Sequence, residues 1–215
     1  MPEALNIGSE IGKLKRVIVH TPGLEIEAMS PDSAEEDLYN DIIPLGIVKS
    51  EHAELKTFLS SIAKTYAVSD LIEETLKSDE NRKEFVRLFT TAYGIHHRAE
   101  DLMAMDAKTL TRVVIHGLPS RHETLSSHLI GKPYDLKPQP NMYFMRDSAL
   151  VYRNSGVACA MRFDVRHTES MLTKFIFNHH PDFKGKGVLF DGGALRKPGF
   201  SLEGGDFQVI APNII

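Results

Sequence analysis

Eight consecutive residues, from Pro140 to Asp147, bring together an amide, two aromatic rings, a guanidinium and a carboxylate. A stretch so rich in hydrogen-bonding and aromatic groups is typical of a binding site. If residues 143–147 form a strand, its period of two places Arg146 and Asp147 on opposite faces. The same residues also fit the start of a buried strand with a surface Arg146–Asp147 pair, and their spacing alone does not decide between the two interpretations.

A second carboxylate, Glu203, precedes two glycines and an aspartate in a Glu-Gly-Gly-Asp motif. Carboxylates bind a guanidinium through paired hydrogen bonds, each worth roughly 1.5 to 3 kcal/mol in a partly dry pocket. The glycines allow a tight turn and a close approach of a ligand to the backbone. Taken alone, Glu203 is better explained as an ordinary turn carboxylate, and Arg166 as a solvated charge after a strand.

Length and composition exclude several classes of function. The chain has 215 residues, of which 42% are hydrophobic and 25% charged, enough for one large or two small domains. A net charge of -4 with interleaved signs argues against nucleic acid, and no apolar run is long enough to cross a membrane. The first ten residues do not resemble a signal peptide, and the single cysteine excludes an intrachain disulfide. We therefore expect a cytoplasmic protein with neither nucleic acid nor membrane as a partner.

The first part of the chain has the pattern of a strand, a helix and a second strand. A β-branched run predicts a strand over 16–20, which ends at a Pro-Gly turn. Apolar residues three and four apart predict an amphipathic helix over 50–66, and a short strand follows near Ala67. This α/β unit leads us to treat residues 1–69 as a first module.

Between residues 70 and 131 the strand signals give way to helix signals. Asp70 and Ser120 each precede a glutamate by three residues, as in capping boxes, and Gly117 lies where a helix C-cap is expected. We predict an all-helical insertion of four or five short helices over this range.

Strand signals return over residues 132–215. We expect strands at 142–152, 156–162, 188–190 and 207–211, the first two joined as a hairpin, with a helix over 169–178 packed on them. A turn near the end predicts another hairpin, with Val209, Ile210, Ile214 and Ile215 on a free edge. We expect that the chain is truncated inside this hairpin.

Several motifs together resemble those of arginine deiminases, enzymes with a five-bladed α/β-propeller fold. The asparagine, phenylalanine, arginine and aspartate of the first motif, followed by Glu-Gly-Gly-Asp at this separation, are far more specific than either motif alone. The resemblance implies an α/β fold, a partial five-bladed propeller of the pentein type with an all-helical insertion. Its parts are a first module over 1–69, the insertion over 70–131, and a second module with the truncated start of a third over 132–215. In order, the matched stretches are Ser9 to Gly12 through Pro22-Gly23, Glu51-His52, Pro140-Asn141 through Arg146-Asp147, Met161-Arg162 through Arg166, Phe175 through Pro181, and Glu203 through Asp206.

The same resemblance implies L-arginine as the substrate, hydrolysed at its guanidinium to citrulline and ammonia. Asp147 and Glu203 would bind the guanidinium, and Glu203 would also serve the proton transfers. Asn141, Phe144 and Arg166 would hold the amino-acid end, a task for which Arg166 is suited because a guanidinium binds an α-carboxylate well.

The resemblance also implies that the nucleophile is a cysteine close to the C-terminus of a chain of roughly twice this length, and that the histidine serving it lies beyond residue 215. Its thiolate attacks the guanidinium carbon, ammonia leaves, and water hydrolyses the thiouronium intermediate. The only thiol here, Cys159, lies in an apolar run typical of a buried strand. We therefore expect the 215-residue chain alone to have no deiminase activity.

Two alternatives remain open. The chain can be explained as a non-catalytic guanidinium-binding or interaction module, or as part of an agmatine deiminase, a dimethylarginine hydrolase or an amidinotransferase. Thr21, Asn40 and Ser148 depart from the arginine deiminase pattern, whereas Arg166 favours an amino-acid substrate over agmatine. We expect no metal and no cofactor, because no histidine pair has ligand spacing and the Gly-Gly turns lack a phosphate-binding pattern. The open faces of a partial propeller predict a homo-oligomer.

Overall fold

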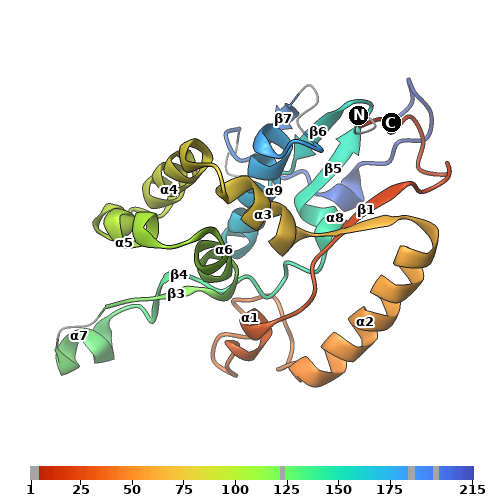
Figure 1. Cartoon of the computed structure of the whole chain (residues 1–215). Helices are drawn as coiled ribbons and strands as arrows, with labels where there is room; N and C mark the ends of the chain where they lie inside the picture. The colour runs from red at the N-terminus through yellow and green to blue at the C-terminus, as the bar shows by residue number, and fades with distance from the viewer. Residues whose placement is uncertain (1–4, 122–123, 184–186, 196–198) are drawn as a thin grey trace.

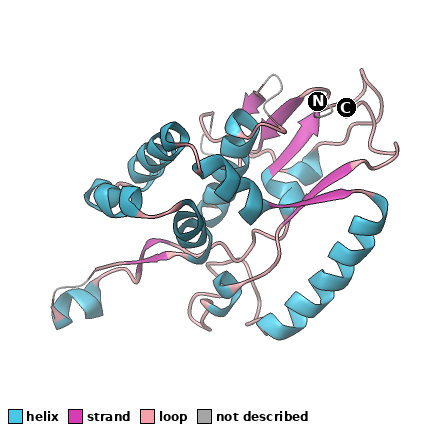
Figure 2. Ribbon diagram, in the orientation of Figure 1, coloured by secondary structure: helices cyan, strands magenta, loops and turns pink. Residues whose placement is uncertain are grey.

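The computed structural model describes residues 5–121, 124–183, 187–195 and 199–215 (Figure 1). Helices predominate over three small sheets of two or three strands (Figure 2). No helix within those ranges is long and apolar enough to cross a membrane. The helices are α1 (Leu24–Glu27), α2 (Leu45–Ile62), α3 (Val68–Leu76), α4 (Asp79–Tyr93), η1 (His96–Arg98), α5 (Ala99–Ala104), α6 (Ala107–His116), α7 (Leu125–Ile130), α8 (Met145–Ser148), η2 (Asp164–Arg166), α9 (His167–His179) and η3 (Gly204–Asp206); the strands are β1 (Arg16–Val19), β2 (Lys64–Ala67), β3 (Leu118–Pro119), β4 (Tyr134–Leu136), β5 (Ala149–Tyr152), β6 (Ser155–Ala158) and β7 (Val188–Asp191).

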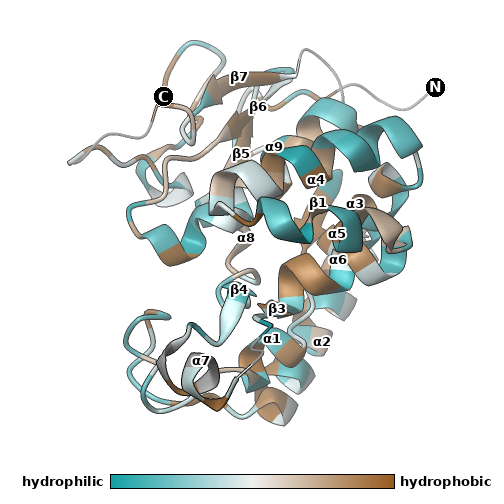
Figure 3. Cartoon of the chain, turned by 90° about the vertical axis from the view of Figure 1, so that its left-hand side faces the viewer, coloured by the Kyte–Doolittle hydropathy of each residue, from teal (hydrophilic) through white to brown (hydrophobic). Residues whose placement is uncertain are grey.

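Strands β1 and β2 pair in parallel, and α2 is the connection between them. This confirms the predicted strand-helix-strand unit, although α2 begins at Leu45, ahead of the predicted helix. The apolar side of α2 is exposed to solvent, as the exposed fractions of Leu55, Phe58 and Ile62 show, at 51%, 63% and 49%. In Figure 3 helices α1 and α2 lie together at one end of the molecule.

The range 70–131, predicted to be an insertion, contains several helices, and some of them have recognisable caps. Ser78 accepts a hydrogen bond from Asn81 N at the start of α4, and Gly94, at a φ of 67°, ends that helix. Gly117 ends α6, as predicted, at a φ of 97°. The capping box predicted at Asp70 is wrong, because α3 begins earlier, at Val68. The box predicted from Ser120 to Glu123 falls outside the described residues.

The prediction that the insertion is all helical is also wrong. Leu118 and Pro119 form β3, which pairs antiparallel with β4. Gly117 leaves α6 in a conformation that only glycine adopts easily, and Pro119 cannot continue a helix, so the chain extends here. Helix α7 lies beyond this two-stranded ribbon, at the far left of Figure 1.

The third sheet has the order β5-β6-β7. Strands β5 and β6 form the predicted hairpin, with Tyr152 opposite Ser155 and a left-handed Arg153, at a φ of 50°, in the turn. Strand β7 is confirmed and pairs in parallel with β6 after the α9 crossover. Helix α9 packs closely on β6, because a Cβ at Gly156 would lie 2.5 Å from the ring of Phe177.

Two predicted strands are shorter than expected, and a third is not formed. Residues 142–148 are not a strand but a turn followed by α8, and β6 ends at Ala158, well before residue 162. Residues 207–211 form no strand, and a single bridge links Ala211 to Ile214. Of the predicted edge residues, Val209 is 1% exposed, whereas Ile214 and Ile215 are open. Hydrogen bonds from Arg153 to Pro212 O, rather than strand pairing, attach this segment to the sheet.

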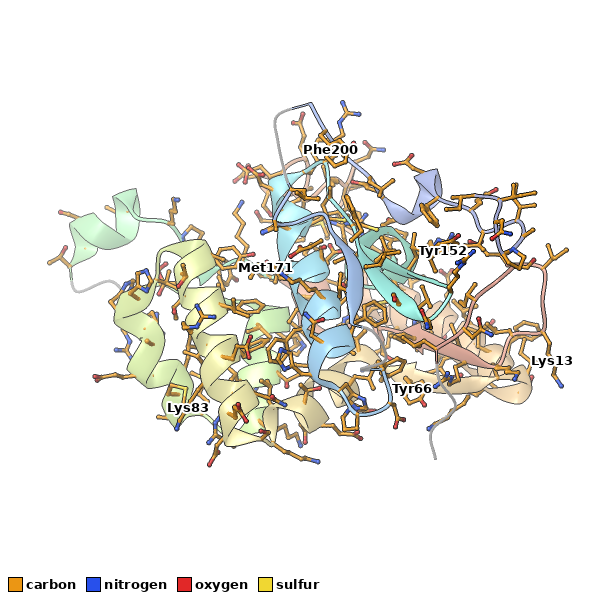
Figure 4. All side chains as sticks on the ribbon, turned by 90° about the horizontal axis from the view of Figure 1, so that it is seen from above. Lys13, Tyr66, Lys83, Tyr152, Met171 and Phe200 are labelled. Carbon is orange, nitrogen blue, oxygen red and sulfur yellow. The ribbon has the colours of Figure 1, made fainter. Side chains whose placement is uncertain are left out.

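One apolar core joins the insertion to the second half of the chain. Phe85 stacks on Phe89 with ring centroids 4.3 Å apart and meets Phe175 of α9 edge-on at 5.0 Å. Met171, also on α9, lies on the side of the helix that faces the insertion (Figure 4). The architecture is therefore mixed α/β, as predicted, and the five-bladed propeller and the module limits stay predictions.

Candidate functional site

Asp147 lies in the single turn of α8, immediately before the first strand of the third sheet. Its backbone N–H donates to the carbonyl of Phe144 at 3.2 Å, so the chain turns where a strand was expected. Strand pairing resumes one residue later, where Cys159 N donates to the carbonyl of Ser148 at 3.0 Å. Asp147 therefore lies at the open end of the β5–β6 hairpin, with its side chain about one-third exposed.

Glu203 precedes η3 and has its carboxylate fixed by backbone donors. Its Oε1 accepts from Arg162 N at 2.9 Å, and it forms a reciprocal capping box with Asp206. In return, Asp206 Oδ2 accepts from Glu203 N at 3.0 Å. These contacts explain the Glu-Gly-Gly-Asp motif as a short cap that orients a partly exposed carboxylate.

The two carboxylate-bearing turns touch through Gly204 and Arg146. A Cβ at Gly204 would lie 1.8 Å from the carbonyl oxygen of Arg146, so only glycine fits here. Arg146 Nε donates to the Gly204 carbonyl at 2.9 Å, and its Nη2 donates to Glu10 at 2.7 Å. Arg146 therefore joins the N-terminal segment, α8 and η3, and brings the turns of Asp147 and Glu203 side by side.

Arg166 lies beneath these turns and is 7% exposed. Its Nη1 donates to Asp147 Oδ2 at 2.6 Å, and its Nε and Nη2 bind the carboxylate of Glu169 at 3.0 and 2.7 Å. Nη2 also donates to the carbonyls of Asn141 and Phe144, both at 3.4 Å. Most of the donor capacity of this guanidinium is thus used within the protein, and Nη1 retains the most for a ligand.

The two other predicted contacts differ from each other in exposure. Asn141 is 4% exposed, and its Nδ2 donates to the carbonyl of Asp37 at 2.8 Å. Phe144 is 44% exposed, with its ring 4.2 Å from that of Tyr143 and 5.9 Å from the Arg166 guanidinium carbon. The structure brings Asn141, Phe144, Asp147 and Arg166 together, with Asn141 turned to the backbone of another loop.

The site holds more negative than positive charge. Burial raises the pKa of Glu169 to about 7, the charges of Asp147 and Glu203 act in the same direction, and Arg166 opposes them. Arg166 in turn is held cationic, because its carboxylate partners raise its pKa more than burial lowers it. Asp147 and Glu169 therefore share the buried guanidinium of Arg166, and the charge of Glu203 adds to theirs. Such a site has capacity for a second guanidinium.

Comparison with known proteins identifies the family. A family model described as arginine deiminase matches residues 36–215. This chain belongs to the arginine deiminase family. Similar curated proteins are the arginine deiminases of Pediococcus pentosaceus, 32% identical over 100% of this chain and 56% of the relative, and of Clostridium perfringens, 32% identical over 99% and 55%. That of Listeria monocytogenes serotype 4a is 32% identical over 100% of this chain and 55% of the relative. The chain spans about half the length of the curated relatives it matches.

Cys159 is wholly buried, near enough to Glu203 and Asp147 for their charges to act on it. Burial raises the pKa of its thiol to about 12, and the charges of Glu203 and Asp147 raise it further. Gly192 packs directly on the backbone of Cys159 and Ala160, with no room for a Cβ. The thiol is therefore a poor nucleophile in this fold.

Sequence reasoning missed two polar residues of the site. Glu169 could have been found, because it follows Arg166 by three residues at the start of a helix, a spacing at which side chains meet. Tyr39 gave no local signal, since its partners lie about a hundred residues away in the chain. Within the described residues no group of three or more histidine, cysteine or acidic side chains is arranged to hold a metal ion.

Proposed function

We propose that this chain provides the guanidinium-binding part of an arginine deiminase, which hydrolyses L-arginine to citrulline and ammonia. The observation that supports the proposal most is the contact between Gly204 and Arg146. It brings the turns of Asp147 and Glu203 together, so that their negative charges act at one place. Two carboxylates at one place suit the planar fork of a substrate guanidinium.

Each residue then has a role that its surroundings support. Asp147 already accepts a guanidinium hydrogen bond, from Arg166, and its second carboxylate oxygen is the acceptor proposed for the substrate. Glu203 binds the other side of the guanidinium and serves the proton transfers. Arg166 orients Asp147 and offers Nη1 to the α-carboxylate, while Phe144, the exposed ring, and Asn141 border the amino-acid end.

The chemical step needs a thiolate, and we propose that Cys159 does not supply it. A thiol with a pKa of about 12, with no exposed surface, cannot reach a bound guanidinium. The 215-residue chain alone then binds L-arginine without converting it.

The test is calorimetric titration of the 215-residue chain with L-arginine, followed by a citrulline assay. We expect binding that weakens at least about tenfold in Asp147→Asn and in Glu203→Gln, because each loses a charged acceptor. The matched control is Asp79→Asn, which removes an exposed ion pair with Arg82 far from the site. Equal affinity in all four proteins, or no binding by the unmodified chain, would reject the proposal.

We also propose that the chain self-associates, as the homo-oligomer inferred from its sequence. Support comes from α2, whose Leu55, Phe58 and Ile62 present apolar surface to solvent. Light scattering over a dilution series tests this, with Phe58→Ser expected to reduce the mass. A monomeric mass at every concentration would contradict it.

A further inference from the structure

Tyr39 lies near the end of the acidic loop, residues 30–41, and its side chain reaches the backbone of the candidate site. Its hydroxyl donates to the carbonyl of Pro140 at 3.0 Å and lies 3.1 Å from the hydroxyl of Tyr143. Burial and the Tyr143 hydroxyl raise the pKa of Tyr39 well above its ordinary value, so the group stays protonated. Tyr39 is therefore a permanent hydrogen-bond donor to the segment that carries the predicted amino-acid contacts.

The backbone just before Tyr39 adopts a conformation that is costly for a side chain. Leu38 has a φ of 70°, in the left-handed region that favours glycine. Tyr39 N then donates to the carbonyl of Ala34 at 2.8 Å, which folds the acidic loop back on itself. Leu38 is 39% exposed, so its own burial does not explain the strain. This turn directs the side chain of Tyr39 towards the carbonyl of Pro140.

The segment that Tyr39 holds also binds Arg166. Nη2 of Arg166 donates to the carbonyls of Asn141 and Phe144, on either side of Tyr143. The side chain of Asn141 is fixed in turn by the carbonyl of Asp37, in the acidic loop. The loop thus contacts the segment through the hydroxyl of Tyr39 and the carbonyl of Asp37, and Arg166 binds the backbone of the same few residues.

We propose that Tyr39 is a positioning residue of the arginine site, which fixes the backbone of residues 140–144 and through it the guanidinium of Arg166. The inference rests on the proposed function, because it makes the acidic loop a determinant of how the amino-acid end of L-arginine is held. Without the hydroxyl, Pro140 loses a donor, and the carbonyls that orient Arg166 gain freedom.

The experiment compares the unmodified chain with Tyr39→Phe in two measurements. The first is the nitrogen NMR signal of Arg166 Nε–H in the free protein, assigned with Arg166→Lys. The second is calorimetric affinity for L-arginine and for agmatine, which lacks the α-carboxylate. We expect the Arg166 signal to shift, L-arginine to bind about two- to tenfold more weakly, and agmatine to change less.

The matched control is Glu36→Gln, which removes the exposed bond from Lys137 to the same loop. It should leave both measurements unchanged, because such exposed pairs contribute little. Tyr143→Phe removes the contact between the two hydroxyls but keeps the bond from Tyr39 to Pro140, so it should shift the Arg166 signal less than Tyr39→Phe does. If Tyr39→Phe does not fold, the Arg166 signal of Tyr143→Phe tests the inference instead. An Arg166 signal identical in all variants overturns the inference. If the unmodified chain binds no L-arginine, the proposed function fails, while the Arg166 signal still decides whether Tyr39 positions it.

Discussion

The backbone of Gly204 packs directly on the backbone of Arg146. The carbonyl oxygen of Arg146 occupies the space that a Cβ at Gly204 would need, and Arg146 Nε donates to the Gly204 carbonyl at 2.9 Å. Because Asp147 follows Arg146 and Glu203 precedes Gly204, this contact sets the relative position of two carboxylates from distant parts of the sequence.

Replacing Gly204 with alanine should therefore damage both stability and the site. We expect Gly204→Ala to lower the free energy of unfolding by about 1 to 3 kcal/mol, since the added methyl meets backbone that cannot move alone. L-arginine binding should weaken about tenfold or more as Glu203 shifts. Urea unfolding and calorimetry measure the two effects. Gly205→Ala is the control, because no heavy atom lies within 4 Å of its Cβ position and both measurements should stay near those of the unmodified chain.

Binding of L-arginine should release a proton. The pKa of Glu169, about 7, lies above its ordinary value, because burial and two other carboxylates disfavour its charged form. A bound guanidinium adds positive charge beside them and lowers that pKa. Near pH 6 we expect release of up to about one proton per arginine, and near pH 9 almost none. Calorimetry in two buffers with different ionisation enthalpies measures the release.

The same pKa sets a trend in stability. Since the folded pKa of Glu169 is raised, the folded protein binds more protons than the unfolded chain between about pH 4.5 and 7. This contribution to stability is complete below about pH 4.5 and is lost as the pH rises to 7. Glu169→Gln should remove both this trend and the proton release. A variant that still releases the proton would assign it to another group.

How much of this site the sequence could predict depends on the range of the interactions. The hairpin around Arg153 and the strand-helix-strand unit follow from local patterns of β-branched and apolar residues. The turn at Phe144 does not, because the continuous run of apolar and aromatic residues from Met142 to Met145 suits a buried strand. The carbonyls of that turn are instead bound by Arg166, which comes later in the chain.

A buried carboxylate, that of Glu25, also links the segment around α1 to helix α6. Glu25 Oε1 lies 2.9 Å from His20 Nε2 and accepts from Gly23 N at 2.7 Å, while Oε2 lies 3.2 Å from His116 Nε2 of α6. Burial raises the pKa of Glu25, but His20 and backbone donors outweigh it, and the net pKa falls below its ordinary value. The pKa of His116 is also lowered, mainly by burial.

Acid should therefore weaken the protein at this junction in two stages. The folded state favours neutral His116, so stability begins to fall below about pH 6.5, and protonation of Glu25 removes more below about pH 4.5. At pH 7, Glu25→Gln should cost about 1 to 3 kcal/mol, because it removes a charged acceptor from buried donors. Thermal unfolding across this pH range is the measurement. Glu27→Gln, on the exposed side of the same short helix, should follow the unmodified chain.

Cys159 should be chemically silent in the folded protein. It has no exposed surface, and a pKa of about 12 leaves roughly one thiol in ten thousand ionised at pH 8. We expect reaction with a disulfide reagent to be at least about a hundredfold slower than for an exposed cysteine, and to become fast in denaturant. The control is Ser50→Cys, at an exposed position on α2, in a Cys159→Ala background.

The same substitution tests whether this thiol takes part in deimination. Cys159→Ala should leave L-arginine affinity unchanged, because the Cys159 side chain packs in a small apolar cluster with Leu150, Val157 and Met161 rather than on the carboxylates. Citrulline formation by the 215-residue chain should stay at background with and without the cysteine. Formation that disappears in Cys159→Ala would make Cys159 the nucleophile, and would require the apolar packing around it to open when arginine binds.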